Sequence, residues 1–229
     1  MAIRMRHIDR TFRQEPQQIG NGEDRGVDVL KDISLDIARG EFVALQGTSG
    51  SGKSTLLQLM GLLDQPSAGS YTLMGRDVAG LDDNARSDLR NCCLGFVFQS
   101  FYLIPYASAL ENVILPGLYS GTSRAELRSR GVSLLERVGL GDRMNFKPSR
   151  LSGGQQQRVA MARALVNEPD IILADEPTGQ LDSTTSEEIM GLFHDVHALG
   201  KTIVLVTHDE IVAAGAGRII HLEDGRIAD

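Results

Sequence analysis

The chain has 229 residues, of which 41% are hydrophobic, and a formal net charge of −7 at pH 7. A chain of this size can bury a sizeable α/β core without metals or disulfides. The acidic balance disfavours general nucleic-acid binding, which usually needs a basic face, so no nucleic-acid partner is expected. The adjacent cysteines Cys92 and Cys93 lie in an apolar stretch and are predicted to be buried, reduced thiols.

No apolar run approaches the roughly 18 residues that a membrane span needs. Residues 1–10 are polar and lack the apolar region of a signal peptide. We therefore expect a cytoplasmic chain whose role at a membrane comes through a partner.

The first half of the chain alternates apolar segments with turns. The apolar pattern predicts strands, in chain order, at 3–8, 29–37, 42–46, 69–75 and 94–98. Helices are expected after the glycine-rich stretch 47–52 and at 82–90. The stretch 14–26, rich in Gln, Gly and charge, is interpreted as an exposed hairpin tip or loop without an assigned role.

The second half is predicted to begin with a mostly helical segment at 101–150, which includes an Arg-rich helix at 124–138 with a solvated face. A helix at 151–167 follows, and then another that Ser183 can cap and Gly200 ends. Strands are expected at 171–173 and 202–206, and a closing hairpin at 218–227. Strands that alternate with helices imply a largely parallel sheet.

A glycine-rich motif carries the clearest chemistry. Residues 47–54 read Gly-Thr-Ser-Gly-Ser-Gly-Lys-Ser, the P-loop pattern, between a strand and a helix. Glycines let backbone N–H groups meet phosphate oxygens, and the helix presents its positive end to the same anion. Lys53 is predicted to reach the β- and γ-phosphates, Ser54 to bind Mg²⁺, and Thr55 to help hold the α-phosphate. The predicted phosphate contacts are Gly47, Thr48, Ser49, Gly50, Ser51, Gly52, Lys53, Ser54 and Thr55.

Two carboxylates follow a buried strand. Asp175 and Glu176 come directly after Ile-Ile-Leu-Ala, at the end of a strand where ligands bind on open α/β sheets. Asp175 is predicted to orient Mg²⁺, and Glu176 to act as general base or to position the attacking water. A solvated acidic turn is the alternative, which the upstream P-loop disfavours.

A second helix start resembles an anion site. Residues 151–155 read Leu-Ser-Gly-Gly-Gln, and a serine with two glycines at a helix N-terminus can bind an anion. Alone, the segment is best interpreted as an ordinary capped helix. A second phosphate cradle in one chain suggests a nucleotide held from two sides, by Ser152, Gly153, Gly154 and Gln155.

The Leu-Ser-Gly-Gly-Gln segment matches the ABC signature, so nearly the whole chain resembles an ABC ATPase. In that family's order, Gln99 matches the Q-loop, which senses Mg²⁺ and the permease, and 179–182, ending at Asp182, resembles the D-loop. His208 matches the switch histidine, and Phe12 stands where an aromatic ring stacks on adenine. The resemblance implies catalytic roles for Lys53, Gln99, Glu176 and His208, Mg²⁺ contacts at Ser54, Gln99 and Asp175, and nucleotide contacts that include Phe12 and Asp182.

The resemblance also implies the fold and the partners. The expected fold is a single α/β domain, 1–229, with a RecA-like P-loop NTPase core, an antiparallel β subdomain and an inserted helical subdomain. The expected division is 1–98 and 160–229 for the core with its β subdomain, and 99–159 for the helical part. ATP and Mg²⁺ are the implied cofactors. Two copies would pack head to tail and drive a membrane permease from the cytoplasmic face of the inner membrane, with a periplasmic adaptor as a further candidate partner.

Shorter motifs resemble the lipoprotein-release and macrolide-efflux branch of the family (LolD and MacB types). They are Gly-Leu-Leu-Asp at 61–64, Gly-Phe-Val-Phe-Gln at 95–99 and Leu-Ile-Pro at 103–105. The alternatives are a cell-division ATPase of the FtsE type and an ABC protein that acts on DNA or ribosomes. Cargo, direction and permease are not readable from the sequence.

Some residues remain without a catalytic role. His7, His194, His197 and His221 are expected to have surface or packing roles. The aromatic residues Phe101, Tyr102 and Tyr106 belong either to the core of the helical subdomain or to a groove for the permease.

Overall fold

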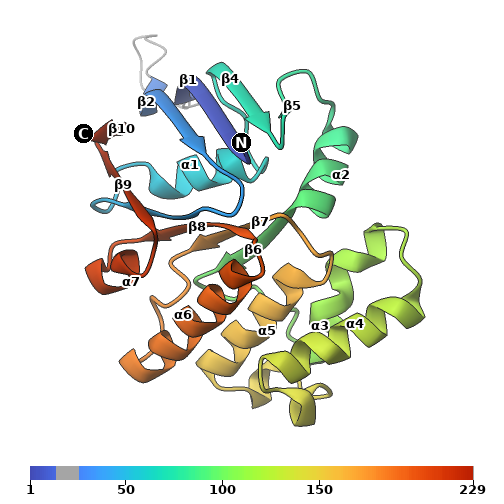
Figure 1. Ribbon diagram of the computed structural model, residues 1–229. Helices are drawn as coiled ribbons and strands as arrows, with labels where there is room; N and C mark the ends of the chain where they lie inside the picture. The colour runs from blue at the N-terminus through green and yellow to red at the C-terminus, as the bar shows by residue number, and fades with distance from the viewer. Residues whose placement is uncertain (14–25, 229) are drawn as a thin grey trace, which may run out of the picture.

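The computed structural model describes residues 1–13 and 26–228, and shows two β-sheets above a layer of helices (Figure 1). The segment 14–25 and residue 229 lie outside the described residues. The expectation for 14–26 therefore meets the structure only at Gly26, which begins a strand.

The larger sheet has six strands in the order β10-β9-β3-β8-β7-β6. They are β3 (Phe42–Gln46), β6 (Leu94–Phe98), β7 (Ile171–Asp175), β8 (Thr202–Thr207), β9 (Arg218–Glu223) and β10 (Arg226–Ala228). All neighbours are parallel except β9 and β10. The central strands are buried along almost their whole length because helices cover both faces. The predicted parallel sheet and closing hairpin are confirmed.

The smaller sheet is antiparallel, in the order β2-β1-β4-β5. Its strands are β1 (Ile3–Arg13), β2 (Gly26–Ile37), β4 (Ala68–Leu73) and β5 (Arg76–Asp77). Helix α1 (Lys53–Met60) lies between the two sheets (Figure 1). Its leucines join one apolar core with both sheets, and this packing fixes the end of α1 that follows the glycine-rich loop.

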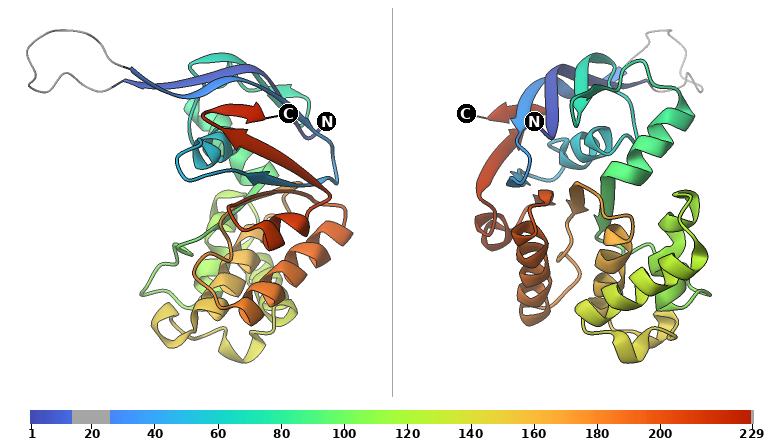
Figure 2. Two further views of the ribbon diagram at one scale, coloured as in Figure 1. Left: turned by 90° about the vertical axis from the view of Figure 1, so that its left-hand side faces the viewer. Right: turned by 45° about the vertical axis from the view of Figure 1, so that its right-hand side comes forward.

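Apart from α2 (Asp83–Cys93), whose Leu89 packs in the same apolar core as α1, the remaining helices lie on the opposite face of the larger sheet (Figure 2). Helix α2 precedes β6, and α3 (Ala109–Ile114), a short 3₁₀ turn (Leu115–Tyr119) and α4 (Arg124–Arg137) follow it. Helices α5 (Gly153–Leu165), α6 (Ser183–Ala198) and α7 (Glu210–Ala214) complete the layer. The sequence pattern missed α7, which has only five residues.

Helix α5 belongs to two cores at once. Met161 and Ala164 pack with the larger sheet and α6, whereas Val159 and Ala162 pack with α3 and α4. The predicted boundary between 159 and 160 therefore falls inside α5. The division into subdomains remains a proposal, and α5 packs into both parts.

The structure corrects one predicted helix cap and several helix ends. Asp182, not Ser183, caps α6, and its carboxylate accepts the N–H of Thr185 at 3.0 Å. Asp182 is the cap because its backbone is extended, as an N-cap requires, whereas the backbone of Ser183 is already helical. Helix α5 begins after Ser152 rather than at Leu151, and α2 extends through both cysteines.

Two predictions about burial change. Cys92 is exposed and Cys93 is partly buried, so the prediction of two buried thiols is wrong for Cys92; both thiols are free. Consecutive helical residues point in different directions, so an apolar neighbourhood in sequence does not bury both. Tyr102 and Tyr106 are 67% and 78% exposed, which excludes them from the core of the helical part.

The four remaining histidines have surface or packing roles, as expected. The ring of His197 bonds the carbonyl oxygen of Gly40, and His194 packs against Phe42. His7 pairs with Asp32 on the surface. None of the helices in the described part of the chain is long and apolar enough to cross a bilayer.

Candidate functional site

The glycine-rich loop connects β3 to α1, and its path requires glycine. Gly52 has a φ of 101°, in the left-handed region that glycine adopts without strain. A Cβ on Gly47 would lie 2.1 Å from the carbonyl oxygen of Leu222. The loop can therefore lie tightly against β9 while Thr48, Ser49 and Gly50 stay exposed.

Lys53 opens α1 and folds back over the loop. Its side chain is buried, and Nζ donates to the carbonyl oxygens of Gly47 at 2.8 Å and Thr48 at 2.7 Å. An ammonium group has three donors, so one remains for a phosphate oxygen. The buried hydroxyl of Ser51 has no partner within the described residues. A phosphate in the loop would take up the remaining donor of Lys53, so the geometry fits the predicted cradle.

Ser54 and Asp175 meet beside this cradle. Ser54 Oγ donates to Asp175 Oδ1 at 3.2 Å, which joins the start of α1 to the end of β7. Burial raises the pKa of Asp175 and Glu176 raises it further, while Ser54 and Lys53 lower it. A cation at this position would favour the charged carboxylate.

The donor set fits Mg²⁺. This ion takes one or two protein oxygens and completes its shell with water and phosphate oxygens. Within residues 1–13 and 26–228, no three His, Cys, Asp or Glu side chains cluster as a metal site. Ser54 and Asp175 would therefore hold Mg²⁺ together with the nucleotide rather than in a cage of protein ligands.

Glu176 sits in a constrained turn at the end of β7. Its φ is 44°, a left-handed conformation that is uncommon outside glycine. Its N–H donates to the carbonyl oxygen of Val206 at 2.9 Å, and its Oε1 lies 2.9 Å from Nδ1 of His208. The neighbouring strand and the histidine thus fix the backbone and the carboxylate separately.

Gln99 lies beside the same carboxylate. A Cβ on Gly179 would lie 2.8 Å from Gln99 Nε2 and 3.3 Å from Glu176 Oε2. Both side chains therefore press against one backbone position, which only glycine leaves free. The structure brings Gln99, Glu176 and His208 together from the ends of β6, β7 and β8.

The signature residues form a separate helix start. Ser152 caps α5, and the capping box with Gln155 is complete: Ser152 Oγ accepts from Gln155 N, and Gln155 Oε1 accepts from Ser152 N. A Cβ on Gly154 would lie 2.4 Å from Thr185, and one on Gly153 would contact Leu181. No P-loop atom lies among these neighbours.

Asp182 and Phe12, which were predicted to contact the nucleotide, are exposed and already interact with residues of their own chain. Asp182 is exposed, and hydrogen bonds from Thr185 lower its pKa, so in one copy of the chain it serves as a helix cap. Phe12 is 40% exposed on β1, and the guanidinium of Arg10 lies 4.3 Å from its ring centroid. Arg10 is in turn paired with Asp64 at 2.8 Å. Arg10 was not predicted as a site residue, and its i, i+2 spacing from Phe12 on a strand is the only local signal for it.

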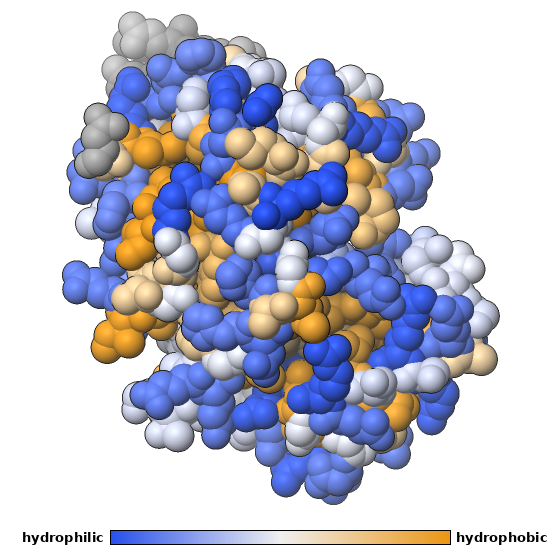
Figure 3. Space-filling view, in the orientation of Figure 1, coloured by the Kyte–Doolittle hydropathy of each residue, from blue (hydrophilic) through white to orange (hydrophobic). Residues whose placement is uncertain are grey.

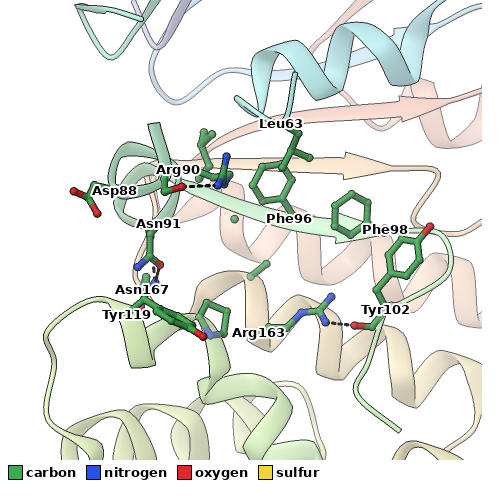
Figure 4. A pocket seen from close by; sticks show the side chains of 15 residues that line it. Leu63, Asp88, Arg90, Asn91, Phe96, Phe98, Tyr102, Tyr119, Arg163 and Asn167 are labelled. Carbon is green, nitrogen blue, oxygen red and sulfur yellow. Dashed lines mark hydrogen bonds between the residues drawn. The ribbon is translucent and has the colours of Figure 1, made fainter. Parts of the chain in front are cut away.

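A groove of about 700 Å³ lies between α2, β6 and the helical part. We call it the α2–α5 groove (Figure 4). Its main apolar lining consists of Leu63, Phe96, Phe98, Tyr102, Pro116 and Tyr119. In Figure 3 a notch in the right-hand outline separates α2 from the helical layer, with hydrophobic surface on its inner side. Two of its lining residues, Phe98 and Tyr102, lie on either side of Gln99 in the sequence.

Arg163 connects this groove to the segment after Gln99. From α5, it donates to the carbonyl oxygen of Phe101 at 2.7 Å. It also donates to the carbonyl oxygen of Tyr102 at 2.6 Å (Figure 4). Both of these residues have positive φ values. Tyr102 lines the groove rather than the core of the helical part, and its contact with a permease stays a prediction. Sequence reasoning did not single out Arg163.

The fold and these positions define a class: a P-loop nucleotide-binding ATPase with a signature helix. A family model described as "ABC transporter" matches residues 30–179. The chain belongs to this ABC transporter ATP-binding family. It is accordingly an ABC-type ATPase that binds ATP with Mg²⁺.

Relatives and solved structures agree with this assignment. The chain is 51% identical over 204 residues to the macrolide export ATP-binding/permease protein MacB of Burkholderia pseudomallei, which covers 89% of this chain but 31% of that protein. It is 51% identical to the ABC transporter ATP-binding protein YvrO of Bacillus subtilis, with 88% of each covered. The chain thus spans about a third of the MacB relatives that it matches.

Among solved structures, the dimeric ATP-binding cassette MJ0796 in a post-hydrolysis state, bound to ADP and Pi, matches with a TM-score of 0.88. It has 43% identity and covers 99% of this chain and 97% of that one. CbiO1 of Clostridium perfringens, described as part of the transporter complex CbiONQ, matches with a TM-score of 0.85 and 31% identity. It covers all of this chain and 87% of that one.

Proposed function

We propose that the chain is the motor subunit of a transporter, in which two copies close head to tail on ATP and reopen after hydrolysis. This proposal rests on one observation: the signature residues Ser152, Gly153 and Gly154 do not contact the P-loop of their own chain. Ser152 is exposed at a helix start whose nearest neighbours, Thr185 and Leu181, come from the α6 region and not from the P-loop. A second copy supplies the missing half of the site.

Within each composite site the residues divide the chemistry. The P-loop amides and Lys53 bind the phosphates, and Ser54 and Asp175 would hold Mg²⁺, which would supply positive charge to the phosphate oxygens. Glu176 accepts a proton from, or positions, the attacking water. His208 holds the Glu176 carboxylate at 2.9 Å, and Gln99 lies on its other side. From the partner copy, Ser152 and the α5 amides would grip the same phosphates.

The α2–α5 groove is the proposed contact for a permease. Its lining is mostly apolar, it has room for a short helix, and Arg163 bonds its wall to the segment after Gln99. If a docked helix displaced Tyr102, the segment that leads back to Gln99 would shift with it. Gln99 lies beside Glu176, so the shift would reach the catalytic carboxylate. The relatives named for macrolide export favour the efflux and lipoprotein-release branch, with the chain peripheral on the cytoplasmic face of the inner membrane. A periplasmic adaptor has no support in the relatives' names.

A mixing experiment tests the composite site. Glu176→Gln removes a function that acts on the chain's own nucleotide, whereas Ser152→Ala removes one that acts on the partner's. In a mixed dimer, one site carries both changes and the other carries neither. We expect the mixture to hydrolyse ATP faster than the mean of the two variants alone. A rate equal to that mean would contradict the head-to-tail arrangement.

Site-specific photocrosslinking in membranes tests the groove. A photoreactive residue in place of Tyr119, 80% exposed in the groove, is expected to crosslink to a permease encoded with this chain. The control position is Leu199, 60% exposed at the end of α6 and outside the groove. Equal permease crosslinking from both positions would rule out the groove as the docking surface.

A further inference from the structure

We propose that Cys92 and Cys93 form a binding site for an organic trivalent arsenical at the junction of α2 and β6. They are the two cysteines of the chain, both thiols are free, and their Sγ atoms lie 3.2 Å apart. Soft thiol ligands favour soft, thiophilic atoms. Two thiols that close together act as a chelate, whereas each alone would bind weakly. Neither the ATPase chemistry nor the groove proposal uses these residues.

The sulfur separation discriminates among thiophilic atoms. Two bonds of about 2.3 Å, the zinc–thiolate length, hold sulfurs about 3.3 Å apart at an angle of about 90° and about 3.8 Å apart at the tetrahedral angle. Trivalent arsenic carries a lone pair and bonds at narrow angles, so the observed spacing suits it. Zinc requires two further ligands, and the described residues contain no cluster of three His, Cys, Asp or Glu side chains.

The number of ligands also matches. An arsenical with one organic group has two exchangeable positions, and the site offers two sulfurs. With phenylarsine oxide, two S–H bonds and the arsenic–oxygen bond break and two arsenic–sulfur bonds form. The two protons leave with the oxygen as one water molecule. Arsenic stays trivalent, so the step needs no oxidant or reductant.

The two thiols have different roles in binding. Cys92 is exposed, and its Sγ donates to the carbonyl oxygen of Leu89 one turn back at 3.5 Å. Cys93 packs against the core shared by the two sheets, and burial raises its pKa to about 12. A thiol that stays protonated is a poor nucleophile. Cys92 therefore makes the first bond, and Cys93 closes the ring because it is already adjacent.

The site borders the α2–α5 groove. Asn91 and Leu94 flank the cysteines in sequence, and both line the groove. Asn167 of α5 donates to the carbonyl oxygen of Asn91 at 3.1 Å and also bonds its side chain (Figure 4). The dithiol thus lies at a junction between the β-rich part and the helical part. The arsenical site itself does not depend on the proposed permease contact.

Titration of the full chain with phenylarsine oxide, read by intact mass, tests the proposal. In the presence of 2-mercaptoethanol, we expect one phenylarsenic group per chain, removed by 2,3-dimercaptopropanol. Cys92→Ser and Cys93→Ser should each lower the apparent affinity by about 100-fold or more, since each loses the intramolecular second bond. ATP binding by both variants shows that they are folded.

A matched control separates chelation from thiol count. Cys92→Ser combined with Ser129→Cys keeps two thiols but places one on the exposed face of α4. This chain should bind as weakly as Cys92→Ser alone. Retention of the adduct by either single variant, tight binding by the control, or no adduct on the wild-type chain would overturn the proposal.

Discussion

Glu176 and His208 lie 2.9 Å apart, carboxylate to imidazole, although they are 32 positions apart in the chain. The pair forms because β7 and β8 are parallel neighbours that end at the same edge of the sheet. The histidine is 64% exposed, whereas the carboxylate is 24% exposed. The imidazole can therefore be reached from outside, by nucleotide or partner, while it holds the carboxylate in place.

We expect Glu176→Gln to bind ATP normally but to lower kcat by about 10²- to 10⁴-fold, because the amide cannot accept a proton. Light scattering should show an ATP-dependent dimer, since without hydrolysis the closed dimer does not reopen. His208→Ala should also reduce turnover, through loss of the contact to Glu176. Wild-type turnover in Glu176→Gln would assign the base to another residue.

Lys53→Ala is expected to weaken ATP binding, because the phosphates lose the buried cation and the loop loses two hydrogen bonds. Equilibrium binding of a fluorescent ATP analogue measures this change. Lys201→Ala is the control, since Lys201 bonds only the carbonyl oxygen of Glu168. Unchanged affinity in Lys53→Ala would refute the phosphate cradle.

Ser152→Arg should block hydrolysis while nucleotide binding by the monomer stays near the wild-type level, because we propose that Ser152 acts on the partner's nucleotide. Ser123→Arg provides a matched control, since Ser123 is also an exposed serine that caps a helix, α4. Both changes lose a cap worth about 1 kcal/mol. Only Ser152→Arg should abolish ATP turnover. If both variants lost turnover equally, Ser152 would act only as a helix cap.

Asp175→Asn is expected to raise the Tm of the nucleotide-free chain while it removes Mg²⁺-dependent turnover. Folding raises the pKa of Asp175, chiefly through burial. A carboxyl with a raised pKa favours the folded state at low pH, and this contribution is lost as pH rises through the raised pKa. The Tm difference between variant and wild type should therefore grow from acid to neutral pH, at about 2–4 °C per kcal/mol. A difference that shrinks with pH would contradict this assignment.

Gln157→Ala tests the link between α5 and the segment after Glu176. Gln157 is fully buried, and its Nε2 donates to the carbonyl oxygen of Pro177 at 2.5 Å. Loss of this donor leaves a buried carbonyl without a partner, which costs about 1–3 kcal/mol. Urea denaturation should show that loss, and Gln156→Ala, whose side chain bonds only Leu151, should show less. Equal effects would mean that the buried bond contributes nothing.

The sequence by itself determined the P-loop, the strand that ends in Asp175 and Glu176, and the signature helix start. Each of these is set by neighbours within a few residues: glycine conformations, helix capping and an apolar run. The alternation of strands and helices also fixed the parallel sheet, because parallel neighbours need a crossover.

Only the tertiary structure decided which distant groups meet and which side chains are exposed. The contacts of Glu176 with His208, of Gln157 with Pro177 and of Arg163 with Tyr102 depend on strand order and on how α5 packs into two cores. The exposure of Cys92 beside the half-buried Cys93 depends on the direction of the last turn of α2. Such contacts join residues far apart in sequence, and local propensity carries no information about them.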